Sequence, residues 1–278
     1  MPGLEDELGD IVRKARAGRG IEVADLVQRA GLTERELKAL EVYTFRPNEA
    51  QTRALAQALG LRAEQLWEIA QESWSAPDVP WGVGDDFTID CLTNDYPEHC
   101  YVVTARASGD CLIVDPGDEP ERIIATATQP GRRPAAILIT HRHQDHTGAV
   151  VPVQRATNTP VFVHQDDEEG VTGVPGDAVR TFGGDGEINA GGVRLGTLHT
   201  PGHTPGSATF VLRSGGATAA FCGDTLFAGS AGNARFGYDV LLSALRDKLS
   251  TLPPTTALYP GHGPATTVAN ELERNPFL

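Results

Sequence analysis

Side chains of metal-ligand type are concentrated in one short segment, THRHQDHTG, which begins at Thr140 and ends at Gly148. A buried group of imidazoles and a carboxylate is costly to desolvate unless an ion compensates for it. Four ligand types at this spacing therefore indicate a metal site and not core packing. The candidate ligands in this segment are His141, His143, Asp145 and His146.

Three later segments can complete the coordination shell. LHTPGHTPGS supplies His203, AFCGDTLFAGS supplies Asp224 and LYPGHGPATT supplies His262. Gly223, beside Asp224, allows the backbone to approach the site closely. Nitrogen and oxygen ligands without sulfur suit zinc, and iron or manganese also fit. Three histidines stay outside these motifs, namely His99, His164 and His199.

Residues 87–278 must position these ligands, and their pattern of strands and helices predicts an α/β domain. CYVVTA and CLIVDPG predict paired strands, DEPERIIATA predicts a helix, and AAILIT predicts a buried strand that ends at the first motif. In open α/β sheets, sites form at the carboxyl ends of strands. Alternation along an extended segment points His141 and His143 toward one ion. Asp145 and His146 follow after the chain turns, so we expect them to serve a second ion.

Residues 1–72 have a different pattern and form a predicted all-α domain, joined to the rest by a linker over residues 73–86 that is rich in proline and glycine. Apolar residues recur at helical spacing in this first part. Gly31 ends one predicted helix, and Thr33 with Glu36 forms a capping box that opens the next. This helix, turn and helix pattern resembles the small five-helix DNA-binding domains of the phage-repressor (Cro/C1, or XRE) type.

The charge of this helix-turn-helix segment disfavours DNA as its partner. It holds ten Lys/Arg and thirteen Asp/Glu, a net charge of −3, and its presumed recognition helix carries Glu34, Glu36 and Glu41. Glutamates that face a polyanion weaken binding. The alternative role is a helical module that dimerises or covers the second domain, and a homodimer is expected by analogy with such modules.

Composition excludes further classes of function. The 278 residues carry a net charge of −14, which disfavours non-specific affinity for nucleic acid or anionic membranes. No run approaches the ~18–20 apolar residues of a membrane span. The acidic start MPGLEDELGD lacks the pattern of a signal peptide, so we expect a cytoplasmic protein. The four cysteines form no CxxC pair, which favours reduced thiols.

Together, the runs THRHQDHTG, TPGHTPGS, GDTLFAGS and YPGHGPATT closely resemble metallo-β-lactamase-fold hydrolases of the glyoxalase II (hydroxyacylglutathione hydrolase-like) type. The resemblance implies an αββα sandwich with two metal ions, expected to be zinc. One metal would take His141, His143 and His203, the other Asp145, His146 and His262, and Asp224 would bridge them. Because the sequence continues only 16 residues beyond His262, the short form of the family is expected.

The implied reaction is hydrolysis of a small acyl thioester by attack of a hydroxide that bridges the two metals. Asp145 and Asp224 are the candidate catalytic carboxylates, with Asp145 taking the proton of the attacking group. The sequence departs from the family at Asn233, where relatives carry a basic residue. Arg235 could instead pair with a substrate carboxylate, and Tyr238 is a third candidate substrate contact.

Two other functions remain open. The first is a mononuclear iron persulfide dioxygenase, in which relatives use two histidines and one aspartate, here His141, His203 and Asp224. The second is a helix-turn-helix regulator whose second domain senses a ligand or a metal. A β-lactamase or lactonase is a further option, because metals alone do not choose the carbonyl.

Overall fold

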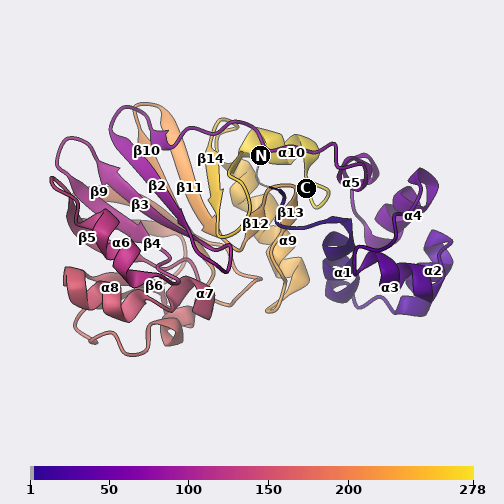
Figure 1. The fold of residues 1–278 in the computed structure, drawn as a ribbon, viewed down its shortest axis with the longest axis horizontal. Coiled ribbons are helices and arrows are strands. Elements are labelled where there is room, and N and C mark those ends of the chain that lie inside the picture. Colours follow the sequence, from indigo (N-terminus) through magenta and orange to yellow (C-terminus); the bar gives the residue numbers. More distant parts are fainter. Residues whose placement is uncertain (1–2) are drawn as a thin grey trace.

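The computed structural model describes residues 3–278 and shows a helical segment at one end of two stacked sheets (Figure 1). The helical segment confirms the all-α expectation for the first part of the chain. Its helices are α1 (Leu8–Gly18), α2 (Val23–Ala30), α3 (Glu34–Leu40), α4 (Glu49–Leu59) and α5 (Ala63–Ala70).

The turn between α2 and α3 has the expected chemistry. Gly31 caps α2 in the left-handed conformation, with φ of 64°. Thr33 and Glu36 form the predicted capping box, in which the Glu36 backbone N–H donates to Thr33 Oγ1 at 3.2 Å. These local features confirm the helix boundaries. The assignment of the segment as a DNA-binding module stays a prediction.

A mixed sheet of seven strands forms the first layer, with strand order β1-β2-β3-β4-β5-β6-β7. The predicted pair CYVVTA and CLIVDPG corresponds to β3 and β4, which are antiparallel, whereas β5 joins β4 in parallel. The strands are β1 (Gly82–Val83), β2 (Phe87–Thr93), β3 (His99–Ala105), β4 (Asp110–Val114), β5 (Arg133–Leu138), β6 (Val161–His164) and β7 (Val179–Phe182).

A second sheet has the order β15-β14-β11-β10-β9-β8. Its strands are β8 (Gly186–Ala190), β9 (Val193–His199), β10 (Ala208–Ser214), β11 (Ala217–Gly223), β14 (Ala257–Pro260) and β15 (Thr266–Thr267). A short hairpin of β12 (Leu226–Phe227) and β13 (Ser230–Ala231) follows β11. The remaining helices are α6 (Pro120–Ala127), α7 (Gln144–Thr147), α8 (Val150–Thr157), α9 (Tyr238–Asp247) and α10 (Val268–Arg274), with 3-10 turns η1 (Gln165–Val171) and η2 (Leu249–Thr251).

Apolar side chains fill the space between the layers and confirm the αββα sandwich. Leu112 and Leu138 of the first sheet share one buried cluster with Phe210 and Phe221 of the second. A separate cluster packs the first sheet against α6 and α8, with Ile123 and Val153 among its members. The other face of the second sheet packs on α9 and α10.

The helical segment shares a hydrophobic core with the second sheet's outer face. Its buried leucines belong to the same cluster as Leu245 of α9 and Phe277 near the C-terminus. Trp74 in the expected linker is also buried there. The Arg62 backbone N–H, just before α5, donates to the Pro276 carbonyl at 2.9 Å, so the helical segment is joined directly to the C-terminal residues.

No helix among residues 3–278 is long and apolar enough to span a bilayer.

Candidate metal centre

Four strand ends and their loops bring the predicted ligands to one edge of the sandwich. β5 leads into the loop that carries His141 and His143, and Asp145 and His146 lie in the short helix α7 that follows. His203 comes from the loop between β9 and β10, Asp224 follows β11 directly, and His262 follows β14. The structure therefore brings together all seven side chains that the sequence motifs singled out.

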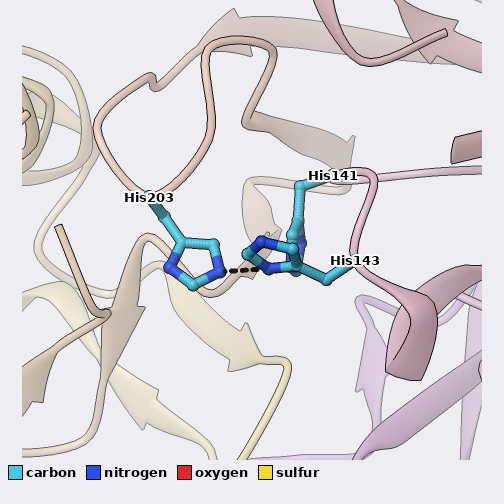
Figure 2. Close-up of side chains that lie close together, drawn as sticks. All are labelled: His141, His143 and His203. Carbon is cyan, nitrogen blue, oxygen red and sulfur yellow. Dashed lines mark hydrogen bonds between the residues drawn. The ribbon is translucent and has the colours of Figure 1, made fainter. Parts of the chain in front are cut away.

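The first group contains only imidazoles: His141, His143 and His203. One nitrogen from each lies within 4.8 Å of the others. Figure 2 shows the three rings converging, and His203 Nε2 lies 2.8 Å from His143 Nδ1. The rings of His141 and His143 are perpendicular, with centroids 4.8 Å apart. Three converging nitrogens supply three of the four positions of a tetrahedral shell.

The second group contains Asp145, His146 and His262, whose ligand atoms also lie within 4.8 Å of one another. Asp145 Oδ2 is 3.4 Å from His262 Nε2. Asp224 lies between the two groups, because its Oδ1 is 3.3 Å from His146 Nε2 and its Oδ2 is 3.4 Å from His203 Nε2. Each oxygen of Asp224 is thus directed at a different group.

Unpartnered polar atoms test whether this arrangement fits a metal. His141 Nε2, His146 Nε2 and Asp224 Oδ1 are buried and have no hydrogen-bond partner within residues 3–278. Burying such atoms without a partner costs about 1–3 kcal/mol each, and more for charged groups. All three point into the ligand cluster, where an ion would satisfy them. The donor set therefore fits divalent metal ions.

Asp115 and Thr140 determine which imidazole nitrogens of His141 and His146 are free to bind a metal ion. A carboxylate only accepts hydrogen bonds, so His146 Nδ1 donates to Asp115 Oδ2 at 3.0 Å and leaves Nε2 as the lone-pair atom. Thr140 Oγ1 donates to the same oxygen at 2.6 Å and lies 3.1 Å from His141 Nδ1, from which it can accept. Both imidazoles are therefore oriented through one buried carboxylate, as is common around bound metals.

The carbonyl of Asn233 fixes the third imidazole. His203 Nδ1 lies 2.7 Å from this oxygen and must donate to it, which leaves His203 Nε2 unprotonated. Burial lowers the pKa of His203 to about 4 and holds the pKa of His141 well below its ordinary value. Burial, together with the charge of Arg235, also lowers the pKa of His143. The first group is thus neutral at neutral pH, the state in which imidazole binds metal.

The second group is charged. Burial lowers the pKa of His146, but the charge of Asp224 and the hydrogen bond to Asp115 outweigh it and raise that pKa well above its ordinary value. Burial also opposes protonation of His262, whose pKa the hydrogen bond to Asp145 nevertheless raises. The hydrogen bond to His262 lowers the pKa of Asp145 in return. The neighbouring carboxylates thus favour a positive charge in this group, and a bound metal ion would supply it.

Two glycines allow this crowding. Gly223 has φ of 49°, and a Cβ there would lie 2.3 Å from Thr140 Oγ1. A Cβ at Gly261 would lie 2.5 Å from Asp224 Oδ1. The close approach expected of Gly223 is therefore confirmed, because any side chain at either position would displace the atoms that form the site.

Two of the three candidate substrate contacts lie at the site. Asn233 and Arg235 line a cavity of about 600 Å³, and five of the seven metal-ligand side chains line it too: His143, Asp145, His203, Asp224 and His262. Tyr238 does not line this cavity, so its choice as a substrate contact is corrected. Its ring packs instead against Gly18 of α1, and the Arg19 guanidinium lies 5.5 Å from its centroid. Tyr238 begins the amphipathic helix α9 and faces the helical segment.

Other residues at the site were not chosen from the sequence. Asp115 belongs to the CLIVDPG run that was predicted as a strand, but its role in orienting two histidines appears only in three dimensions. Glu98 is fully buried, with Oε1 3.8 Å from His146 Nδ1. Burial raises the pKa of Glu98 to about 9. An isolated glutamate in a turn gave no signal of this position.

A further histidine group, His164 with Asp166 and His199, lies outside the centre. The Asp166 backbone N–H donates to His164 Nδ1 at 3.2 Å, and His199 Nε2 donates to the Pro205 carbonyl at 2.8 Å. The two rings are stacked, with centroids 4.1 Å apart. Backbone groups already occupy these nitrogens, which agrees with the place of His164 and His199 outside the ligand motifs.

Proteins with similar sequences align with about 60% of this chain. A probable metallo-hydrolase, YqgX of Bacillus subtilis (strain 168), is 38% identical over 187 residues, which are 60% of this chain and 87% of the relative. The hydroxyacylglutathione hydrolase GloC of Haemophilus influenzae (strain ATCC 51907 / DSM 11121 / KW20 / Rd) is 33% identical over 187 residues, 61% of this chain and 87% of that protein.

Solved structures also resemble the sandwich. TTHA1623 in a di-iron-bound form is 33% identical, with a TM-score of 0.54 over 72% of this chain and all of that one. ETHE1 from Myxococcus xanthus is 25% identical, with a TM-score of 0.58 over 68% of this chain and 83% of that one. The model of the metallo-beta-lactamase superfamily matches residues 93–262, which span the whole ligand set. This chain therefore belongs to the metallo-beta-lactamase superfamily.

Proposed function

We propose that this protein is a dinuclear-metal hydrolase that cleaves a small acyl thioester. The observation that carries the proposal is the set of unpartnered buried atoms, His141 Nε2, His146 Nε2 and Asp224 Oδ1, within a ligand cluster of which Asp224 and four other members line one cavity. Membership of a metallo-hydrolase superfamily supports it, as do hydroxyacylglutathione hydrolases at 33–36% identity.

The ligand assignment follows the two groups. His141, His143 and His203 would hold one ion, and Asp145, His146 and His262 would hold the other, with one oxygen of Asp224 directed at each group. Zinc suits this set of nitrogen and oxygen donors, as do iron and manganese. The di-iron form of the relative TTHA1623 fits a site for two ions. The identity of the metal belongs to the proposal.

The chemistry divides between the ions and the side chains. Bound divalent ions acidify a water molecule toward a pKa of about 7 and polarise the substrate carbonyl. Asp145, whose side chain is 40% exposed and 3.4 Å from His262, faces the cavity and accepts the proton of the attacking water. Asp224 keeps its oxygens directed at His146 and His203 throughout. Arg235 binds the carboxylate of the thiol product at the cavity wall.

One experiment on a single sample tests the proposal. Metal per chain is counted on protein purified without added metal, and thioester hydrolysis is assayed with S-lactoylglutathione on the same protein. About two ions per chain with turnover supports the hydrolase. His262→Ala should lose about one ion and most activity, whereas the exposed control Asp177→Asn should keep both. Unchanged metal content and rate in His262→Ala would contradict the dinuclear assignment.

A mononuclear iron persulfide dioxygenase is the second candidate. The likeness to ETHE1 from Myxococcus xanthus gives it support, and His141, His203 and Asp224 would form its ligand set. It ranks lower because the second group, Asp145, His146 and His262, is complete. About one iron per chain, with oxygen uptake on a persulfide and no thioester turnover, would select this candidate over the hydrolase.

A further inference from the structure

The cavity above the metal centre has a second wall that comes from the helical segment. One side carries the metal-ligand residues with Asn233 and Arg235. The other side is formed by residues before and within α1 and by one residue after α3. We call this side the helical wall, and its residues are Glu5, Asp6, Asp10, Arg13, Lys14 and Tyr43.

A buried ion pair fastens the helical wall to the sandwich. Lys14 Nζ donates to Asp6 Oδ2 at 2.5 Å and to the Ala231 carbonyl at 3.0 Å. Ser230 Oγ donates to the same Asp6 oxygen at 2.5 Å. Both charged side chains are only 6% exposed. Because separating such a pair leaves an unpaired buried charge, the wall is a fixed part of the cavity.

The same attachment connects the helical wall to a metal-ligand residue. Lys14 Nζ lies 4.9 Å from the centroid of the Phe227 ring. Phe227 in turn meets the His262 ring edge to face, with centroids 5.8 Å apart. The position of α1 is therefore set relative to the second ion-binding group and not only relative to the other helices.

Arg13 is the cation of the helical wall that can reach a ligand. Its side chain is 47% exposed, and Asp10 Oδ1 holds its Nη2 at 2.5 Å. Tyr43 Oη donates to both oxygens of Asp10 at 2.8 Å. Asp10 therefore orients Arg13 and Tyr43 together. A guanidinium has five N–H donors, so most of those on Arg13 stay available for a second carboxylate.

Arg235 supplies a cation from the other side. Its side chain is exposed and forms no ion pair with any carboxylate of residues 3–278. Arg235 lines the same cavity as His143 and His203, which places it close to the metal centre. The cavity thus has one available guanidinium on each side.

We propose that Arg13 of the helical wall, together with Arg235, binds a carboxylate on the thiol part of the substrate. This inference rests on the proposed thioesterase function and names its substrate class: acyl thioesters whose thiol carries a carboxylate. The three carboxylates of this wall, Glu5, Asp6 and Asp10, outnumber its two cations, so the wall repels ligands of high negative charge. This excess of carboxylates favours a single carboxylate on the ligand over a phosphorylated or polymeric anion. The helical segment is then a determinant of substrate specificity.

Binding to the metal-loaded full chain tests the proposal independently of turnover. Calorimetry compares glutathione with its diethyl ester, which lacks the free carboxylates but keeps the thiol. Wild type should bind glutathione about tenfold more tightly, the value of one charged hydrogen bond. Arg13→Ala and Arg235→Ala should each remove most of this preference. Arg29→Ala, an exposed arginine on α2 with no place in the cavity, should keep it.

Kinetics supply the second measurement. Arg13→Ala should raise KM for S-lactoylglutathione about tenfold with kcat little changed, because the carboxylate is bound equally in ground and transition states. Arg13→Lys should recover part of the loss, since lysine keeps the charge but not the paired geometry. A glutathione preference that is absent in wild type, or unchanged in Arg13→Ala, would overturn the inference.

The two proposals fail in different ways. If the carboxylate preference depends on Arg13 but no thioester is hydrolysed, the carboxylate-binding role stands and the proposed reaction falls. If thioesters are hydrolysed with the same KM by wild type and Arg13→Ala, the reaction stands and the role of the helical wall falls.

Discussion

The two walls of the cavity hold their charges in different ways. On the metal-ligand wall, Asp224 and the imidazoles leave lone pairs unpartnered and directed at one another. On the helical wall, every buried charge has a partner, because Asp6 pairs with Lys14 and Asp10 pairs with Arg13. The first arrangement is satisfied only by an ion, and the second is satisfied by the fold itself. Changes in the first wall should therefore affect metal and rate, and changes in the second should affect stability and substrate choice.

The largest effect is expected from Asp224→Ala. Asp224 lies within 3.8 Å of the Nε2 atoms of His146, His203 and His262, so its loss should weaken both ion-binding groups at once. Activity should fall about 10³-fold or more, beyond the 10–100-fold typical of residues behind the ligands. Metal analysis and initial rates measure the effect, with Asp177→Asn as the carboxylate control. A variant that keeps two ions per chain would show that Asp224 does not bridge them.

Lys14→Met should have the next largest effect, on stability and not on the ligands. It leaves the Asp6 charge buried without its partner, which should lower the free energy of unfolding by about 3–5 kcal/mol. Chemical denaturation of the metal-loaded protein measures this. The double variant Lys14→Met with Asp6→Leu should recover much of the loss, because no buried charge remains. Equal destabilisation of the single and double variants would contradict the ion-pair explanation.

Asp115→Asn should have an intermediate effect on the metal-ligand wall. The amide keeps the shape of the side chain, but its single oxygen cannot replace both carboxylate oxygens. In the native protein Oδ2 accepts from Thr140 Oγ1 and His146 Nδ1, and Oδ1 accepts from the Thr140 backbone N–H at 2.7 Å. Metal affinity should fall about 10–100-fold, which competition with a chelator can measure. The folded state should persist in far-UV circular dichroism. If affinity equals that of wild type, the orientation of His146 does not depend on Asp115.

The smallest effect is a change in pH dependence from Glu98→Gln. The pKa of Glu98 in the folded protein is about 9, above its ordinary value of 4.5, so the native state binds this proton more tightly. Its contribution to stability is therefore complete below about pH 4.5 and is lost as the pH rises toward 9. Glutamine mimics the protonated acid, so metal-free Glu98→Gln should lose less stability over this range than wild type. The free energy of unfolding is plotted against pH for each protein, with the exposed Glu168→Gln as the control. If wild type and Glu98→Gln have equal slopes, or if Glu168→Gln changes the slope instead, the assignment is contradicted.

The comparison of the walls also explains what could be predicted from the sequence. Ligands such as His141 and His203 occupy short motifs after strands, where local spacing carries the chemistry. The αββα fold followed from the same motifs. The helical wall could not be predicted, because Lys14 meets Ala231 across a sequence separation of 217 residues. No periodicity in either segment encodes that contact.

Tyr238 shows the complementary difficulty. It stands close in sequence to Asn233 and Arg235, and nearness in sequence made it a candidate substrate contact. The chain turns at Gly237 into α9, and the apolar face of that helix directs Tyr238 toward α1. A side chain at the beginning of a helix can face away from the loop just before it, which composition alone does not reveal.

The backbone hydrogen bond between Arg62 and Pro276 has a consequence for biosynthesis. Translation produces α1–α5 first, but part of the surface on which they pack, including Phe277, is produced some two hundred residues later. Until that part of the chain is synthesised, the nascent helices keep apolar surface exposed, as early folding intermediates do. Chaperone dependence during synthesis, and its relief when α9 and α10 are supplied as a separate polypeptide, would be the cellular sign of this late closure.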